Sequence, residues 1–253
     1  MIVNLIPCLA DNYSYCIIDA VNKNVILIDP AEFGTVDNFL KNKNLVPNYI
    51  LNTHHHSDHV GGNILLKQKY NCSILGFAAD KDRIPGIDTF LKDKETTKIG
   101  NLEIETHHAP GHTSGHVFYY LRNEKIAFVG DIVFSLGCGR IFEGTIEQMY
   151  HSINKVKNLA PETRIFCGHE YTKSNLNFCI SIDKNNKDLK IKEQIILDQR
   201  KHNIPTIPTT VMDEQKTNIF FRLNDTKIRK AISLENATEL EVFSKLRKLK
   251  DNF

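Results

Sequence analysis

The chain has 253 residues, enough to bury a substantial core, and its 41% hydrophobic and 25% charged residues are ordinary for a globular protein. A formal net charge of +2 is too small to favour nucleic acid or an anionic membrane as the main partner. No stretch approaches the ~18 apolar residues of a membrane span, and the N-terminus has no secretory signal pattern, so we expect a cytoplasmic protein. The six cysteines are scattered without a CxxC pair, which predicts reduced thiols rather than disulfides.

Short β-type runs recur through the first two-thirds of the chain. Continuous apolar runs such as VILID and KIAFVGD are typical of strands that are covered on both faces. The strands predicted on this basis span residues 2–6, 15–19, 24–29, 49–53, 73–76, 102–107, 117–121, 126–130 and 164–167. Helices are predicted between them over residues 36–41, 61–70 and 146–158.

The character of the sequence changes after about residue 172, where strand signals nearly vanish and helical periodicity takes over. Helices are predicted there over residues 174–182, 189–202, 226–233 and 238–249, with the proline-containing stretch NIPTIPTT between the second and the third. We therefore expect a mixed α/β domain over residues 1–171, followed by a helical domain over residues 172–253.

The stretch THHHSDHVGG, residues 53–62, places four histidines and an aspartate within six positions. It follows a predicted buried strand and leads through two glycines into a predicted helix. A solvated polar loop would be the simplest reading. A metal site is the alternative, because a loop leaving a buried strand can turn His54, His56, Asp58 and His59 toward neighbouring points. Imidazole and carboxylate suit zinc, iron or manganese, and the absence of a thiolate argues against a structural zinc knuckle.

Three further candidates lie downstream, each at the end of a predicted strand. His112 lies in APGHTSGH, Asp131 in FVGDIVF and His169 in IFCGHEY. Each of them alone would be an ordinary turn or cap residue. Together with the histidine-rich stretch they predict a metal site, because strand ends commonly carry functional residues and these side chains suffice for two metals.

The remaining six histidines are not expected to bind metal, since they lack this strand-end context or alternate away from their neighbours: His55, His107, His108, His116, His151 and His202. For His116 two readings stay open. It is either a turn residue satisfied locally or a residue that supports a metal ligand.

The motif HxHxDH, followed in order by His, Asp and His, resembles the signature of the metallo-β-lactamase superfamily. Within that superfamily the chain resembles the glyoxalase II, or hydroxyacylglutathione hydrolase, family. The resemblance runs nearly from end to end, through THHHSDHVGGN, APGHTSGH, FVGD, GCGRIFEGT, CGHEYT and the final LRKLKDNF. Sister families share the first motifs but not the last three. The resemblance implies an αββα sandwich with a C-terminal helical domain.

The resemblance also implies two divalent metal ions per chain. It assigns the ligands in two sets that share one bridging residue: His54, His56 and His112 for one metal, Asp58, His59 and His169 for the other, and Asp131 between them. We expect zinc, with iron or manganese as alternatives, because ligand type does not separate these metals.

The implied reaction is hydrolysis of S-D-lactoylglutathione to glutathione and D-lactate, a step in methylglyoxal detoxification. A hydroxide held between two metals about 3.5–4 Å apart would attack the thioester carbonyl. The thiolate leaves without a dedicated general acid, because a thiol has a pKa of only about 8.5. Asp58 is expected to orient the nucleophile as well as to bind metal, and Asp131 to be essential for catalysis.

The glutathione moiety carries two carboxylates, which cationic groups would suit. The positions that match the family's substrate contacts are Arg140, Tyr171, Arg247 and Lys250. The chain departs from the family pattern at two positions. Arg140 stands where some members carry lysine, and Phe142 stands where some carry tyrosine, which removes a hydroxyl donor. NIFFR, residues 218–222, also lacks an expected proline.

Several other functions compete with this one. A mononuclear iron persulfide dioxygenase of the same superfamily is the nearest rival, and the basic C-terminal helix and complete second ligand set argue against it. A β-lactamase would often carry cysteine in place of Asp131, and a nuclease would have a more basic surface. A di-iron redox module would carry glutamate in place of His56. A non-catalytic metal-binding protein stays open. We expect a monomer that binds a small molecule.

Overall fold

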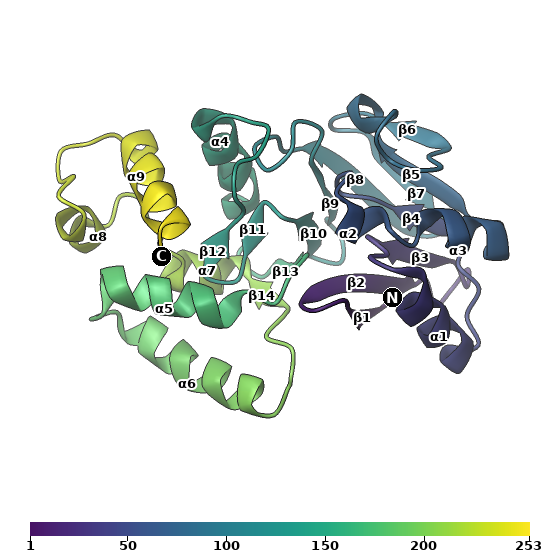
Figure 1. Cartoon of the computed structure of the whole chain (residues 1–253), viewed down its shortest axis with the longest axis horizontal. Coiled ribbons are helices and arrows are strands. Elements are labelled where there is room, and N and C mark those ends of the chain that lie inside the picture. The colour runs from purple at the N-terminus through teal and green to yellow at the C-terminus, as the bar shows by residue number, and fades with distance from the viewer. The chain divides into compact units, whose positions relative to one another are not determined.

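The computed structural model describes residues 1–253 and divides into two compact units (Figure 1). Unit 1 comprises Met1–His108 and Gly115–Gly130. Unit 2 comprises Ala109–Ser114 and Asp131–Phe253. Compactness therefore groups residues 131–171 with the C-terminal helices, whereas the change in sequence character falls near residue 172.

The first sheet of unit 1 has six strands in sequence order. They are β1 (Ile2–Cys8), β2 (Asn12–Ile18), β3 (Val25–Ile28), β4 (Tyr49–Leu51), β5 (Ser73–Phe77) and β6 (Thr89–Leu91). The first three are antiparallel, and β3 to β6 are parallel. The apolar run of β3 is entirely buried, as expected for a strand covered on both faces.

Helices connect the parallel strands because a parallel pair needs a crossover. They are α1 (Phe33–Lys43), α2 (Ser57–Val60) and α3 (Asn63–Tyr70), with a 3-10 turn at Ala78–Asp80. Val36 and Leu40 of α1 are fully buried in the cluster that packs on this sheet. The α1 helix ends at Asn44, which takes the left-handed conformation at φ 52°.

Unit 1 contains a second group of strands, all antiparallel: β7 (Thr96–Ile99), β8 (Leu102–His108), β9 (Val117–Leu121) and β10 (Ile126–Gly130). Every residue of β9 and β10 is buried. The Tyr15 ring of β2 lies 5.3 Å from the Phe128 ring of β10. The Tyr119 hydroxyl of β9 donates to the Asn52 carbonyl at 2.7 Å, so the two groups of strands pack against each other.

Unit 2 carries the hairpin β11 (Val133–Phe134) and β12 (Gly137–Cys138), and the antiparallel pair β13 (Arg164–Cys167) and β14 (Thr209–Thr210). Its helices are α4 (Ile146–Lys157), α5 (Thr172–Asp183), α6 (Lys187–Lys201), α7 (Val211–Thr217), α8 (Thr226–Ala231) and α9 (Glu239–Asp251). The α5 and α6 helices lie side by side, and α9 packs on α4 (Figure 1).

A buried glutamate holds the parts of unit 2 together. The Glu214 carboxylate of α7 accepts hydrogen bonds from the Leu136 amide at 2.7 Å and the Thr209 hydroxyl at 2.6 Å. Lys192 of α6 donates to it at 2.8 Å, and Asn218 at 2.9 Å. A buried carboxylate is tolerated because it is both paired with a charge and fully hydrogen-bonded.

The predicted mixed α/β class is confirmed, and each predicted strand and helix has a counterpart in the structure. The elements that the sequence did not reveal are short: β6, β7, β11, β12, β14, α2 and α7. Two to four residues are too few to show a period, and the polar sequence VMDEQKT of α7 has no clear apolar face. None of the helices combines the length and the apolar character needed to cross a bilayer.

An ion cluster joins α1 to α3 in unit 1. The buried carboxylate of Asp37 accepts from Lys69 at 2.5 Å and from the Tyr70 hydroxyl at 2.6 Å, and it pairs with Lys41 at 2.8 Å. Burial by itself would raise the pKa of Asp37, but the hydrogen bonds from these three side chains outweigh it and hold the pKa well below its usual value.

We predict that Asp37→Asn lowers the free energy of unfolding by about 2 kcal/mol near neutral pH, because charge-assisted hydrogen bonds are lost. Since the folded-state pKa is depressed, the stabilisation exists above the unfolded pKa of about 4 and is lost as the pH falls below it. Urea unfolding at pH 7 and pH 3 measures both. The exposed Asp198→Asn serves as the control, and an equal effect of Asp37→Asn at both pH values would contradict the prediction.

Candidate metal centre

Strand β4 delivers the histidine-rich segment of unit 1. Asn52, fully buried just after the strand, donates to the His59 carbonyl at 3.1 Å and so closes the loop around the histidines. The His54 ring lies 4.1 Å from the His59 ring and 4.7 Å from the His56 ring. The predicted ligands of this stretch are therefore gathered at one place, and the reading as a solvated loop is wrong for His54 and His59, which are buried.

The hydrogen bonds behind these rings fix which nitrogen faces the site. His59 Nδ1 lies 3.1 Å from Asp29 Oδ2. His54 Nδ1 lies 3.0 Å from the Thr53 hydroxyl, and that hydroxyl donates to Asp29 at 2.6 Å. Because Thr53 uses its proton on Asp29, its oxygen accepts from His54. Both imidazoles thus carry their proton on Nδ1 and present the lone pair of Nε2.

Asp29 lies close enough to His54 and His59 to be a ligand itself, since their ligand atoms lie within 4.8 Å of one another. Its oxygens, however, already accept from Thr53 and His59, and from the Thr53 amide at 2.7 Å. The residue takes the left-handed conformation at φ 47°, which is uncommon for a residue other than glycine. It is therefore placed to orient the ligands.

Asp58 stands at the rim of this group, with its side chain 37% exposed. Its Oδ2 atom lies 3.8 Å from His59 Nε2 and accepts a hydrogen bond from Asn12 at 2.9 Å. Asn12 also donates to the Asp58 carbonyl at 3.1 Å, so both ends of the residue are held by one amide. The carboxylate is therefore placed beside the His59 ring nitrogen, where the two side chains could share a metal.

His116 lies directly against this group, a position suited to a residue that supports a metal ligand. Its ring is fully buried and stacks on the His54 ring at 4.7 Å, with 23° between the planes. A Cβ on Gly130, which has φ 48°, would lie 2.7 Å from His116 Nε2 and 2.5 Å from the Thr53 hydroxyl. Only glycine fits where β10 passes these residues.

Unit 2 brings together the other three predicted ligands, all of them buried. His112 Nε2 lies 3.5 Å and His169 Nε2 lies 3.3 Å from the same Asp131 oxygen, Oδ2. One carboxylate oxygen between two imidazole nitrogens is the arrangement that a bridging carboxylate requires. The backbone behind Asp131 is crowded, since a Cβ on Gly139 would lie 1.9 Å from the Asp131 carbonyl oxygen.

The His112 ring of unit 2 is oriented in the same manner as the His54 and His59 rings of unit 1. His112 Nδ1 donates to the Arg140 carbonyl at 2.9 Å, which leaves Nε2 as the acceptor. The His169 ring stacks on Tyr171 at 4.7 Å with 3° between the planes. Phe142, 62% exposed, contacts the edge of His112 at 5.1 Å. Exposed aromatic rings thus flank both predicted ligand histidines of this unit.

The donors of both units fit a divalent metal. They are imidazole nitrogens, which in His54, His59 and His112 lie opposite a protonated Nδ1, together with carboxylates, and they include no thiolate. This set suits zinc, iron or manganese. All seven of these residues were predicted from the sequence, which gave no indication of the residues behind them: Asp29, Thr53 and Asn12. Asp29 carries the same signal as Asp131, an aspartate directly after a buried apolar strand.

The predicted substrate contacts differ in exposure. Arg140 and Tyr171 are exposed, whereas Arg247 is only 3% exposed. The Arg247 guanidinium donates to the Cys138 carbonyl at 2.8 Å and pairs with Asp251 at 2.9 Å. The same guanidinium therefore also braces the backbone that leads to Arg140.

Lys250 is half-buried on the last turn of α9. Its ammonium lies 5.4 Å from the Phe178 ring and 5.3 Å from the Phe253 ring, and it donates to the Ser174 hydroxyl at 3.2 Å. Burial, and then the positive charge of Arg247, lower the pKa of Lys250. The ammonium of Lys250 is thus partly desolvated and surrounded by aromatic rings and a hydroxyl.

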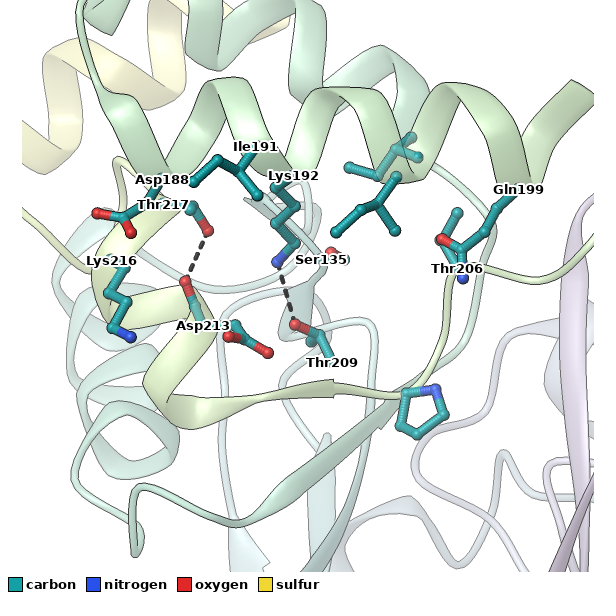
Figure 2. Close-up of a pocket in the computed structure, with 13 residues that line it drawn as sticks. Ser135, Asp188, Ile191, Lys192, Gln199, Thr206, Thr209, Asp213, Lys216 and Thr217 are labelled. Carbon is teal, nitrogen blue, oxygen red and sulfur yellow. Dashed lines mark hydrogen bonds between the residues drawn. The ribbon is translucent and has the colours of Figure 1, made fainter.

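A separate pocket of about 280 Å³ lies in unit 2 between α6 and α7 (Figure 2). Figure 2 shows Lys192 reaching across it to the Thr209 hydroxyl, at 3.1 Å. Isoleucines of α6 form one wall, among them Ile191 and Ile195. None of the predicted metal ligands or substrate contacts lines this pocket.

The chain matches the family model described as metallo-beta-lactamase superfamily over residues 11–169. Fold and donor set agree with this match, and the chain belongs to that superfamily. A second model, hydroxyacylglutathione hydrolase C-terminus, matches residues 170–253. Within the superfamily the chain belongs to the hydroxyacylglutathione hydrolase family.

Curated relatives match over the whole chain. The hydroxyacylglutathione hydrolase of Pelagibacter ubique is 49% identical and covers 100% of both chains. That of Methylococcus capsulatus is 40% identical over 98% of this chain and 97% of its own. The family resemblance inferred from the motifs is confirmed by these matches.

Solved structures confirm the fold. ETHE1 from Myxococcus xanthus superimposes with a TM-score of 0.67 at 20% identity, over 96% of this chain and 95% of its own. The BLEG-1 B3 metallo-beta-lactamase also gives 0.67, at 22% identity, over 87% and 99%. TTHA1623 in a di-iron-bound form gives 0.53 at 25% identity, over 62% and 87%. The predicted metallo-β-lactamase-type fold is correct.

We predict that Asp29→Asn weakens metal binding by about 10–100-fold, because the amide no longer holds the His54 and His59 tautomers. Competition with a chromogenic chelator measures the affinity, and unfolding of the metal-free protein reports any change in stability.

Asp19→Asn is the matched control, since Asp19 is also a buried aspartate that directly follows a strand of the same sheet and accepts from the Val21 amide. Metal affinity equal in the wild type and in Asp29→Asn would show that this carboxylate does not orient the ligands.

Proposed function

We propose that the chain hydrolyses S-2-hydroxyacylglutathione thioesters, with S-D-lactoylglutathione as the preferred substrate, and so removes methylglyoxal as D-lactate. The observation that carries this proposal is the match of residues 170–253 to the C-terminal model of this family, beside full-length relatives that bear its name. Superfamily members of other function share the first motifs, whereas this C-terminal part is the portion suited to bind glutathione.

The proposed centre holds two divalent metal ions, most simply zinc. His54, His56 and His112 would hold one, Asp58, His59 and His169 the other, and Asp131 both. The fixed Nε2 lone pairs and the position of Asp131 between two imidazoles support this assignment, as does the di-iron form of the related TTHA1623. Metals of this kind activate water near neutral pH and polarise carbonyl oxygens.

The remaining residues bind and orient the substrate. Arg140 offers an exposed guanidinium, and Lys250 a partly desolvated ammonium, to the carboxylates of glutathione. Arg247 adds its positive charge near these carboxylates while its guanidinium donates to the Cys138 carbonyl. Tyr171 presents its hydroxyl beside His169, and Phe142 offers an apolar face in place of a donor. Asp58, anchored by Asn12, orients the attacking water.

No side chain needs to protonate the leaving group, because a thiolate is a stable anion near neutral pH. Asp131 is therefore expected to act through metal binding rather than as an acid. We propose further that residues 172–253 serve as the substrate-binding part and that the protein works as a monomer. Its six cysteines are all free and buried, which suits a reducing compartment such as the cytoplasm.

The test is steady-state hydrolysis of S-D-lactoylglutathione, with metal content measured on the same preparation. We expect turnover with close to two metals per chain, and a loss of at least a hundredfold in kcat/KM for Asp131→Ala. Bound metal without thioester turnover would overturn the substrate assignment. Oxygen uptake with glutathione persulfide, on a single iron, would instead indicate a dioxygenase.

We predict that Lys250→Ala raises KM about 10-fold and leaves kcat nearly unchanged, because a contact to the non-reacting part of the substrate binds the ground state and the transition state equally. The matched control is Lys248→Ala, which removes an exposed lysine from the same helix turn. Equal effects of the two variants would argue for a general charge effect.

The lowered pKa of Lys250 also predicts a pH dependence. As the pH rises through that pKa, the ammonium loses its proton and its attraction for a carboxylate, so KM should rise below the usual lysine pKa of 10.5. In Lys250→Arg the charge persists and KM should stay flat over that range. Measuring KM of the wild type and of Lys250→Arg between pH 7 and pH 10 tests this pH dependence.

A further inference from the structure

Asp80 is a buried carboxylate with no assigned role. It ends the 3-10 turn Ala78–Asp80 that follows β5, and its side chain is 0% exposed. A charged carboxylate is costly to bury and needs partners. Arg83, three residues on, supplies the balancing charge through a salt bridge. The remaining contacts of Asp80 all lead to the segments that carry and support the histidine ligands of unit 1.

The first of these contacts is made with His55. Asp80 Oδ2 lies 3.1 Å from His55 Nδ1, and the Arg83 guanidinium lies 3.5 Å from His55 Nε2. Both nitrogens of this ring are thus occupied on the side of Asp80. Since His55 stands between His54 and His56 in the chain, anchoring its ring fixes the backbone from which the two ligands project.

The second contact is made with Gly115. A Cβ placed on this glycine would lie 1.9 Å from Asp80 Oδ1, so the carboxylate packs directly on the backbone at this point. The next residue, His116, stacks on the ring of His54. Asp80 therefore touches both of the segments whose rings meet in the metal centre of unit 1.

We propose that Asp80 is a positioning residue, which clasps His55 on one side and Gly115 on the other and so sets the placement of His54 and His56 for metal binding. This inference rests on the metal centre of the proposed function but not on its substrate. A carboxylate behind the ligands keeps their geometry fixed before the metal arrives, which lowers the cost of ordering them on binding.

The test compares metal affinity with stability. Asp80→Asn should weaken zinc binding by about 10–100-fold in chelator competition. His55→Gln should give a loss of similar size, and the double variant should lose no more than either single variant, because both changes break one contact. Gly115→Ala, which displaces the carboxylate without altering any polar group, should weaken binding as well.

Asp88→Asn is the control, since Asp88 lies in the same connection, pairs with Lys67 and contacts no histidine of the site. If Asp80 only stabilises the fold, Asp80→Asn will lower the stability of the metal-free protein and leave zinc affinity unchanged, which overturns the proposal.

Zinc binding by the wild-type protein tests the metal centre separately from the role of Asp80. If it binds no zinc, the metal centre itself fails and Asp80 has nothing to position. If Asp80→Asn does not fold, His55→Gln decides the matter alone, because its change lies on a partly exposed side chain outside the ligand set.

Discussion

An imidazole can offer only one nitrogen to a metal, and the proton on the other nitrogen must be held by the protein. Each candidate ligand histidine therefore needs a hydrogen-bond acceptor behind its ring. Asp29, at the end of β3, serves the His59 and His54 rings, the latter through Thr53. The Arg140 carbonyl does the same for His112. The acceptors come from distant parts of the sequence, so the ligand geometry is only as well defined as the packing that brings those parts together.

That packing leaves little room around the ligands. Gly130 and Gly115 stand where any side chain would strike Thr53, His116 or Asp80. The glycines of motifs such as FVGD and GHTSGH are thereby explained by contact rather than by flexibility alone. Strand ends carry the polar side chains of the candidate site. Because Gly115 and Gly130 lack a Cβ atom, Asp80, His116 and Thr53 can pack against the backbone at these points.

The C-terminal helix shows how burial changes the meaning of a basic stretch. In sequence, the run RKLK resembles a solvated helix face. In the structure Arg247 is buried against backbone carbonyls, whereas Lys250 lies among aromatic rings with a lowered pKa. Two residues three positions apart thus have different surroundings: Arg247 braces the segment before Arg140, and Lys250 carries a partly desolvated charge.

The sequence by itself determined the order of the long strands and helices, because apolar periodicity is a local property. It also predicted the candidate donor set, since HxHxDH with its three later partners combines residue types that are typical of a metal site. The tertiary structure alone decided which residues stand behind those donors. Asp29 and Asp80 are ordinary aspartates in sequence, and they acquire roles only because β3, β4 and β5 end side by side. Contacts between residues 25 positions apart leave no local pattern, and the burial that distinguishes Arg247 from Lys250 depends on surfaces that only the folded chain creates.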